Sequence, residues 1–204
     1  MNNEFEYYLI ENAGVPSVPL LMNNDDMNPK GNRLSVVYRS TRVVVDSPIY
    51  LSINPPYPAK PNFDVDFLQH PFSVYSQKIH DVLIPLNIKD YNLLPCIIVD
   101  RKGEEYKEFW LEHIYNAIPC IDTEQSGCRY IAFGKTWGNF KKIVLKNELL
   151  EEIPLEDRLI FRPKETSEFM LYHRTIVNAI MAVKPINIKF IPVDKWYQGI
   201  QFGG

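Results

Sequence analysis

The two stretches that decide the fold class are FSVYSQKIHDVLIPL, residues 72–86, and FMLYHRTIVNAIMAV, residues 169–183. In each stretch, a short apolar lead-in ends in tyrosine. Apolar residues then follow at the i, i+3, i+4, i+7 spacing of an amphipathic helix. The sequence therefore predicts two main amphipathic helices that are related by a weak internal repeat. Chance similarity is the alternative, because the identical positions are few.

Each predicted helix is followed by a short apolar strand that ends in Val-Asp, at residues 96–100 and 188–194. Pro85 lacks the amide that a helix interior needs, so we expect the first helix to end near Leu83. Ser76 is well placed to cap the first helix through its hydroxyl group. His173 occupies the matching position of the second helix and is a weaker cap.

Segments rich in β-branched and aromatic residues predict strands before, between and after these helices. We expect these strands at residues 5–10, 33–38, 42–45, 49–53, 109–115, 129–133, 140–146 and 158–162. Residues 39–41 would then connect the second and third strands as a hairpin. Strands outnumber helices, and the helices come early and late in their region. This order indicates an α+β fold with a mostly antiparallel sheet.

A proline-rich segment follows the last of the N-terminal strands, with Pro55, Pro56, Pro58, Pro61 and Pro71. Proline donates no hydrogen bond to a sheet and restricts the residue before it, so this segment should be an extended connector. We expect it to separate an N-terminal β-rich subdomain, residues 1–60, from an α+β domain, residues 61–204. The two parts together would form one compact unit.

The composition is 46% hydrophobic and 23% charged, which is typical of a globular protein that buries a core without disulfides. Acidic residues outnumber basic ones, the net charge is −3, and no basic stripe is present, which disfavours nucleic-acid binding. No apolar run approaches the roughly 20 residues that span a bilayer, and residues 1–11 lack the basic start of a secretory signal. We therefore expect a cytoplasmic protein.

The cysteines and histidines indicate neither a metal centre nor a cofactor. Cys96, Cys120 and Cys128 show no CxxC spacing and are expected to be buried free thiols in a reducing compartment. A disulfide between Cys120 and Cys128 is the alternative. The histidines show neither the HxH nor the HExxH spacing that would place two imidazoles on one face.

No complete catalytic motif is present. The tripeptide GKT at residues 134–136 resembles the end of a phosphate-binding loop, but Arg129 stands where that loop needs its first glycine. Ser126 lacks the preceding glycine of a nucleophile elbow. Asp122 and His113 could serve as its partners only if the fold brought them together, so a small hydrolase is the alternative to the expected absence of enzymatic activity.

Four acidic residues form two pairs on either side of Ile153-Pro154-Leu155, namely Glu151, Glu152, Glu156 and Asp157. Such a run is commonly an exposed, solvated loop. It could also be an acidic contact surface for a protein partner. The three tryptophans and twelve tyrosines are expected mostly in the core, and a few could anchor such an interface.

Several further stretches occur together with the two helices: DFL at residues 66–68, EFWLEHIYN at 108–116, CIDTEQS at 120–126, LIFR at 159–162, and residues 188–196. With these stretches, the C-terminal two-thirds of the chain resembles immunity family eleven, a family of bacterial polymorphic-toxin immunity proteins. The N-terminal 60 residues contribute little to the resemblance. His173 departs from the family pattern, in which a small capping residue is usual.

The resemblance implies a protein that is made alongside a secreted toxin and binds it, without turnover or cofactor. Asp122 and Ser126 would then be structural and close a turn by accepting hydrogen bonds from backbone amides. A rigid β scaffold would cover the active site of the toxin and bury on the order of 1,600 Å². A module that binds a protein unrelated to toxins is the alternative.

Overall fold

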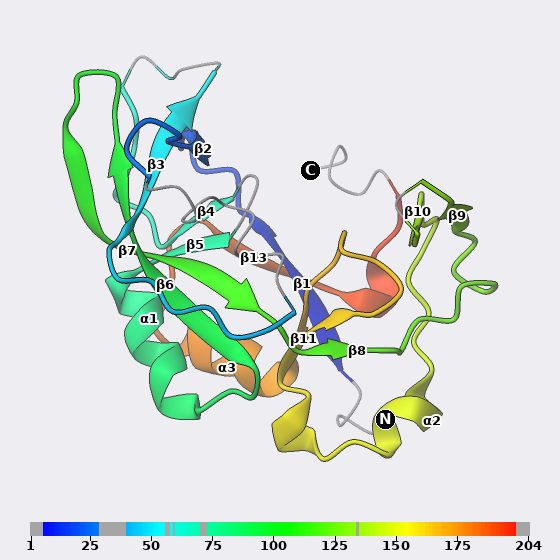
Figure 1. Cartoon of the computed structure of the whole chain (residues 1–204). Helices are drawn as coiled ribbons and strands as arrows, with labels where there is room; N and C mark the ends of the chain where they lie inside the picture. Colours follow the sequence, from blue (N-terminus) through cyan, green and yellow to red (C-terminus); the bar gives the residue numbers. More distant parts are fainter. Residues whose placement is uncertain are drawn as a thin grey trace.

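The computed structural model describes residues 6–28, 40–55, 58, 60–69, 73–133 and 135–198. Within these residues the chain forms an α+β fold with many strands, few helices and largely antiparallel sheets, which confirms the predicted class. The six-stranded sheet lies at the left of Figure 1, and the segment from β8 to α2 lies at the right. The predicted strand at residues 33–38 falls outside the described residues.

The six-stranded sheet has the order β2-β3-β6-β7-β5-β4. Its strands are β2 (Leu20–Asn23), β3 (Ile49–Asn54), β4 (Phe67–Gln69), β5 (Ser73–Ser76), β6 (Tyr91–Val99) and β7 (Glu105–Ile114). Within this sheet, β3 and β6 are the only neighbours that pair in parallel. Pro95 is tolerated inside β6 because β3 pairs with this strand only from Cys96 onward, so no amide is needed at residue 95 on that side.

The five-stranded sheet has the order β13-β1-β12-β11-β8. Its strands are β1 (Tyr7–Asn12), β8 (Ala117–Ile118), β11 (Ile160–Pro163), β12 (Leu171–His173) and β13 (Ile188–Pro192). A separate hairpin consists of β9 (Arg129–Ile131) and β10 (Thr136–Gly138). The chain also contains α2 (Asn147–Glu151) and the single-turn helices η3 (Ile84–Leu86), η4 (Leu155–Asp157) and η5 (Val193–Lys195).

The two main helices, α1 (Gln77–Leu83) and α3 (Arg174–Ala182), each follow a strand without a connecting loop. They lie side by side below the sheets in Figure 1 and contact each other. Their apolar stripes point inward, since Ile79, Ile176 and Ile180 are completely buried. Pro85 lies in η3, just after the end of α1. That the two units derive from one repeat stays a prediction.

The two helix caps differ from the expectation. Ser76 is at the N-cap position of α1, but its hydroxyl makes no capping hydrogen bond. It donates instead to Oδ1 of the buried Asp66 at 2.6 Å. This bond to a charged carboxylate is stronger than a capping bond between the hydroxyl and a backbone amide would be. His173 is the residue that caps, because its Nδ1 accepts the amide of Thr175 at 3.2 Å.

The strands alternate, so that both sheets direct one face toward the helices. Phe67, Tyr75 and Tyr172 point toward α1 and α3, and all three are completely buried. The opposite face of the six-stranded sheet forms a second cluster around Leu51 and Leu111. The opposite face of the five-stranded sheet packs against the segment between β8 and α2 and forms a third.

Strand pairing crosses residue 60 in both sheets. β1 pairs with β12 and β13, and β3 pairs with β6. The N-terminal 60 residues therefore supply strands to the same two sheets as the rest of the chain. A boundary between subdomains at that position stays a prediction based on the proline-rich composition.

Two predicted strands are wrong. Residues 42–45 are irregular, although Val43 is buried and its carbonyl accepts a hydrogen bond from Asn92. Residues 140–146 form only isolated bridges, because the amides of Lys141 and Val144 are taken by the carbonyl and the hydroxyl of Ser126. The helix α2, which follows this segment, was not expected.

Neither a membrane span nor a metal site is found among the described residues. None of the helices there combines the length and the apolar character needed to cross a bilayer. No three metal-ligating side chains gather in that part of the chain. All three cysteines are free: Cys96 and Cys120 are buried, Cys128 is half-buried, and the alternative disulfide is absent. Burial raises the pKa of the Cys96 and Cys120 thiols.

Candidate partner-binding surface

The four predicted contact residues lie in one short surface segment, residues 151–157, which we call the acidic segment. Glu151 ends α2, and Glu152 follows it. Glu156 and Asp157 lie in η4. The two residues of the first pair and Glu156 are exposed, and Asp157 is half-buried. The structure therefore places all four carboxylates on the surface, within two adjacent helical turns.

The structure adds Lys89 and Asp90 to this surface. Nζ of Lys89 lies 2.5 Å from Oδ2 of Asp157. The hydrogen bond to Asp157 raises the pKa of Lys89, and the charges of Asp157, Asp90 and Glu156 act in the same direction. The pairing places a cation among these carboxylates and partly neutralises Asp157. The sequence did not predict this contact, because Lys89 and Asp157 lie far apart along the chain.

A buried arginine fixes the acidic segment to the sheet. Arg158 follows η4, and only 1% of its surface is exposed. Its Nε donates to the carbonyl of Ile153 at 2.9 Å, inside the acidic segment. Its Nη1 donates to the hydroxyl of Tyr7, in β1, at 2.8 Å. The backbone that carries the carboxylates is thereby held against the five-stranded sheet, which favours a rigid contact surface.

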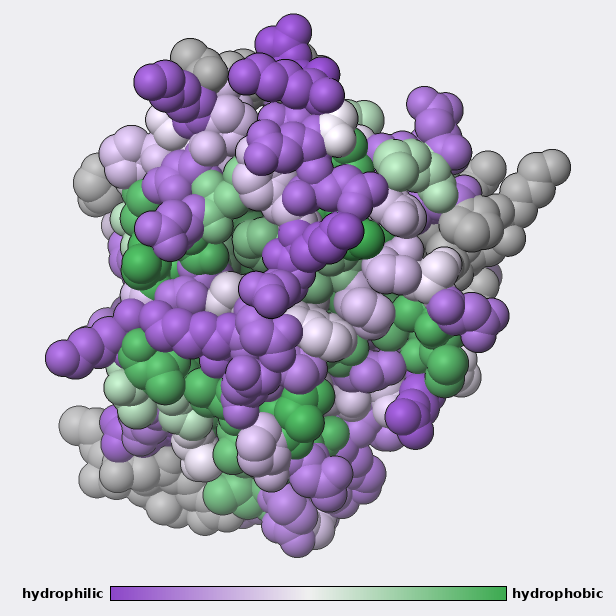
Figure 2. All heavy atoms as spheres, turned by 90° about the vertical axis from the view of Figure 1, so that its left-hand side faces the viewer, coloured by the Kyte–Doolittle hydropathy of each residue, from purple (hydrophilic) through white to green (hydrophobic). Residues whose placement is uncertain are grey.

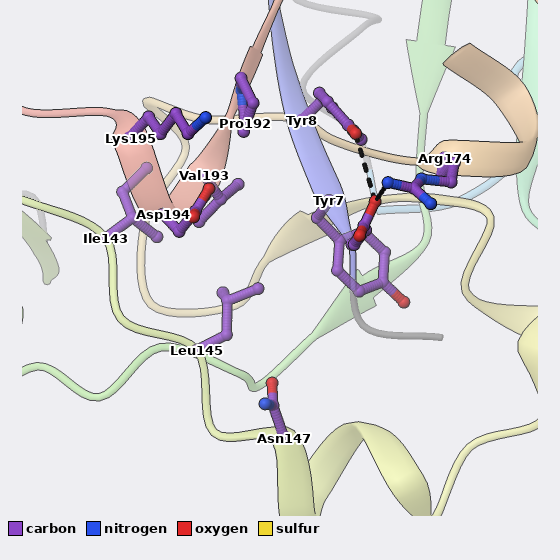
Figure 3. Close-up of a pocket in the computed structure, with 11 residues that line it drawn as sticks. Tyr7, Tyr8, Ile143, Leu145, Asn147, Arg174, Pro192, Val193, Asp194 and Lys195 are labelled. Carbon is purple, nitrogen blue, oxygen red and sulfur yellow. Dashed lines mark hydrogen bonds and ion pairs between the residues drawn. The ribbon is translucent and has the colours of Figure 1, made fainter. Parts of the chain in front are cut away.

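A groove of about 610 Å³ lies next to α2. Figure 3 shows Ile143 and Val193 at the left of the view, Tyr7 at the right, and Leu145 below them. Arg174, Lys195, Asp194 and Asn147 add polar groups to its lining. The lining thus comes from the irregular segment that was predicted as a strand and from β1, β13 and η5, with single residues of α2 and α3.

The polar end of the groove is already paired. Arg174 forms an ion pair with Glu6, and the hydroxyl of Tyr8 donates to the same carboxylate at 3.3 Å. Both interactions are drawn in Figure 3. The groove therefore combines an apolar, partly aromatic lining with charges of both signs, which is the composition of many protein-binding surfaces.

The groove and the acidic segment are connected through α2 and through the hydrogen bond between Tyr7 and Arg158. Asn147, which lines the groove, is the first residue of α2, and Glu151 is its last. Tyr7 also lines the groove and accepts the hydrogen bond from Arg158. We call this combined region the groove face. It brings together the predicted carboxylates and residues that the sequence pattern did not single out.

The residues of the hydrolase alternative do not share a cleft. His113 is completely buried in β7. Asp122 lies in a turn, where its Oδ1 accepts the amide of Gln125 at 2.9 Å. Ser126 is also buried, and its hydroxyl oxygen accepts the amide of Val144 at 3.0 Å. Neither the groove nor a second cavity beside Phe63 and Asp66 is lined by any of these three residues.

Hydrogen bonds to backbone amides are the contacts that a turn-closing role for Asp122 and Ser126 requires. The side chain of Asp122 accepts two hydrogen bonds from Gln125, one from its amide and one from Nε2 at 2.8 Å. The Gln125 amide is the leading cause of the lowered pKa of Asp122. Gly134 of the GKT tripeptide lies outside the described residues; Thr136 starts β10, and its hydroxyl donates to the carbonyl of Glu165 at 3.0 Å.

The sequence pattern did not single out Glu112, a glutamate that the fold buries. Glu112 in β7 is 3% exposed, and its carboxylate accepts the hydroxyls of Tyr172 at 2.6 Å and Tyr75 at 3.3 Å. Desolvation raises its pKa to about 7 despite these hydrogen bonds. Strand alternation could have found it, because Trp110 and Ile114 flank Glu112 on the face that packs against the helices.

The sequence itself was also compared with known proteins. Residues 18–195 match the model of a family described as an immunity protein family, Imm11. No curated protein matches the chain at a significant level. The matched region begins after β1 and ends in η5, so it includes the acidic segment and most of the groove.

Proposed function

The chain belongs to the immunity protein family Imm11, and from this premise we propose that it neutralises a cognate secreted bacterial toxin by covering its active site. In this proposal the chain and the toxin domain belong to one polymorphic toxin system. Inhibition takes place in the cytoplasm of the producing cell or its neighbours. The inhibitor acts by stoichiometric binding, without cofactor, turnover or contact with nucleic acid.

The single observation that supports the groove face as the toxin-binding surface is its rigidity beside an apolar groove. Arg158 ties the acidic segment to Tyr7, and Tyr7 lines the groove. A preorganised surface loses less conformational entropy on binding. Tyr8, the half-buried tyrosine of the groove lining, would contribute much of the affinity, because aromatic residues that become buried on binding dominate interface energies. The carboxylates would accelerate encounter with a basic toxin.

The acidic segment should control the rate of association. Replacing Glu151, Glu152 and Glu156 by lysine should lower the association rate constant for the toxin at least about tenfold at low salt, since steering depends on complementary charge. The salt dependence of association should shrink as well. Asp157 stays unchanged because it holds Lys89. Stopped-flow association at several salt concentrations provides the measurement.

A matched control uses exposed glutamates at the opposite end of the molecule. Glu104 and Glu105, at the turn between β6 and β7, are also exposed. Their replacement by lysine should change association much less than the triple substitution does. Equal rates for the wild type and the triple variant would remove the acidic segment from the toxin-binding surface.

Co-expression tests the proposed function as a whole. The toxin-type domain encoded beside this chain is expressed alone and together with it. Rescue of growth, with recovery of a complex of the two proteins, is the expected result. Rescue without a complex, accompanied by chemical change of the toxin, would favour the enzyme alternative. Absence of rescue would favour a binding module that is unrelated to this toxin.

A further inference from the structure

The hairpin β9–β10 exposes an unusual amount of apolar surface. All three residues of β9 are exposed, so this strand contributes nothing to the core. Tyr130 is 51% exposed, Ile131 is 37% exposed, and Phe133, at the turn, is fully exposed at 104%. Large apolar side chains that gather on one exposed element commonly mark an interaction site.

The hairpin is nevertheless held in place. The amide of Trp137 and the hydroxyl of Thr136 both donate to the carbonyl of Glu165, at 2.9 and 3.0 Å. Trp137 packs against the third core cluster and meets Tyr130 edge to face, with the ring centroids 5.4 Å apart. An isolated two-stranded hairpin is only marginally stable, so these anchors are what hold the exposed side chains in position.

A glycine permits the close fit of the hairpin. A Cβ atom at Gly138 would lie 2.7 Å from Cδ1 of Ile131 and 2.7 Å from Oε1 of Glu168. A larger residue would require the ends of the Ile131 and Glu168 side chains to move. The exposed side chains of β9 are therefore carried by a closely packed pair of strands and not by a loose loop.

Basic side chains occur in the same stretch of the chain as the exposed apolar residues. Four are exposed in or directly after the hairpin: Arg129, Lys135, Lys141 and Lys142. Acidic groups lie beside it as well, among them Glu165, whose carboxylate accepts the amide of Cys120 at 3.0 Å, and Glu168. Tyr130, Ile131 and Phe133 with these four basic residues form what we call the hairpin surface. The charge of these four residues is opposite to that of the acidic segment.

The hairpin strands β9 and β10 lie apart from α2, although Lys142 of the hairpin surface directly precedes Ile143 of the groove lining. In Figure 1, β9 and β10 are at the upper right, and α2 is at the lower right. The face that carries α1 and the turn between β6 and β7 differs from both: it is mostly hydrophilic, and its hydrophobic patches are separated by hydrophilic side chains (Figure 2).

We propose that the hairpin surface is a second toxin-contact element, which binds an apolar patch bordered by carboxylates on the toxin domain. This inference rests on the proposed function. Phe133 and Tyr130 would anchor the contact by burial, and the four basic residues would pair with carboxylates at its rim. Two contact elements of opposite charge would also fix the orientation of the complex, because a reversed arrangement would bring like charges together.

The test compares the toxin affinity of the full-length wild type with that of a Tyr130→Ala, Phe133→Ala double variant. The dissociation constant should rise by about 30-fold or more, the effect expected when anchor side chains are removed. Lys135→Glu with Lys141→Glu should weaken binding too. Phe133 is fully exposed and Tyr130 about half exposed, so the double variant should stay folded, with only a small fall in thermal stability from the lost Tyr130–Trp137 contact. Met22→Ala, which truncates a side chain 42% exposed on β2, is the matched control and should change affinity little.

The outcomes separate this inference from the proposed function. If the wild-type chain does not bind the toxin, the proposed function is wrong and the hairpin proposal fails with it. If the wild type binds and the double variant binds equally well, only the hairpin proposal is wrong. Aromatic and basic groups can also bind single-stranded RNA. The probe is a uridine RNA of 20 nucleotides. The proposal would be overturned in favour of RNA if this probe binds the wild type but not the double variant, and if both proteins bind the toxin equally well.

Discussion

Replacing Arg158 by alanine should lower the free energy of unfolding by about 4 kcal/mol, one of the larger losses that a single substitution causes. The substitution removes one of the largest completely buried side chains of the chain. It also leaves the carbonyl of Ile153 and the hydroxyl of Tyr7 without the hydrogen bonds that Arg158 donates. The cavity and the unpaired polar groups both act against folding.

Denaturant unfolding at neutral pH measures this loss. Arg129, which is exposed on the hairpin, provides the matched control, and Arg129→Ala should change the free energy of unfolding by less than about 0.5 kcal/mol. Hydrogen exchange should also accelerate at the amides of Ile153 and Asp157 in the Arg158 variant, because the acidic segment loses its anchor. A variant as stable as the wild type would show that Arg158 does not hold this segment.

Raising the pH from 5 to 8 should lower the free energy of unfolding of the wild type by about 2 to 3 kcal/mol through Glu112 alone. Its pKa is raised from 4.5 to about 7 in the folded chain. Between these two values the folded state holds a proton that the unfolded state has released, so stability falls as the pH rises. The contribution is lost as the pH rises through about 7, and by about pH 8 both states are ionised.

Glu112→Gln should remove this decline. Glutamine keeps the shape of the side chain and can still bond with the hydroxyls of Tyr75 and Tyr172, but it does not ionise. The difference in unfolding free energy between the two proteins isolates the titration of Glu112 from that of other groups. Parallel pH profiles for wild type and variant would mean that the buried carboxyl does not titrate in this range.

The sequence predicted the parts of the fold that depend on local periodicity. The apolar spacing around Ile79 and Ile176 located α1 and α3, and alternation located β3. Residues 140–146 were misassigned because their β-branched composition suits a strand, while their amides bond to Ser126, a partner that only the folded chain brings close. The capping roles of Ser76 and His173 were reversed for the same reason, since Asp66 competes for the Ser76 hydroxyl.

The candidate site was less accessible to prediction. The acidic residues were visible as a charge run, but Lys89, Asp90 and Tyr7 reach the same face only through tertiary structure. Arg158 was predicted only as the first residue of a strand, and the hydrogen bond that it makes in the interior reaches Tyr7, which is far away in the sequence. Local sequence patterns thus identified the exposed carboxylates. The residues that hold these carboxylates in position are brought together only by long-range packing.

Titration of the purified toxin domain with this chain tests the central claim, inhibition by binding through the outer surface of the molecule, most directly. Toxin activity should fall in proportion to the inhibitor added and vanish at one equivalent. Both proteins should be recovered from the complex chemically unchanged. Inactivation of many equivalents of toxin by one of this chain, or full toxin activity in the presence of excess chain, would contradict it.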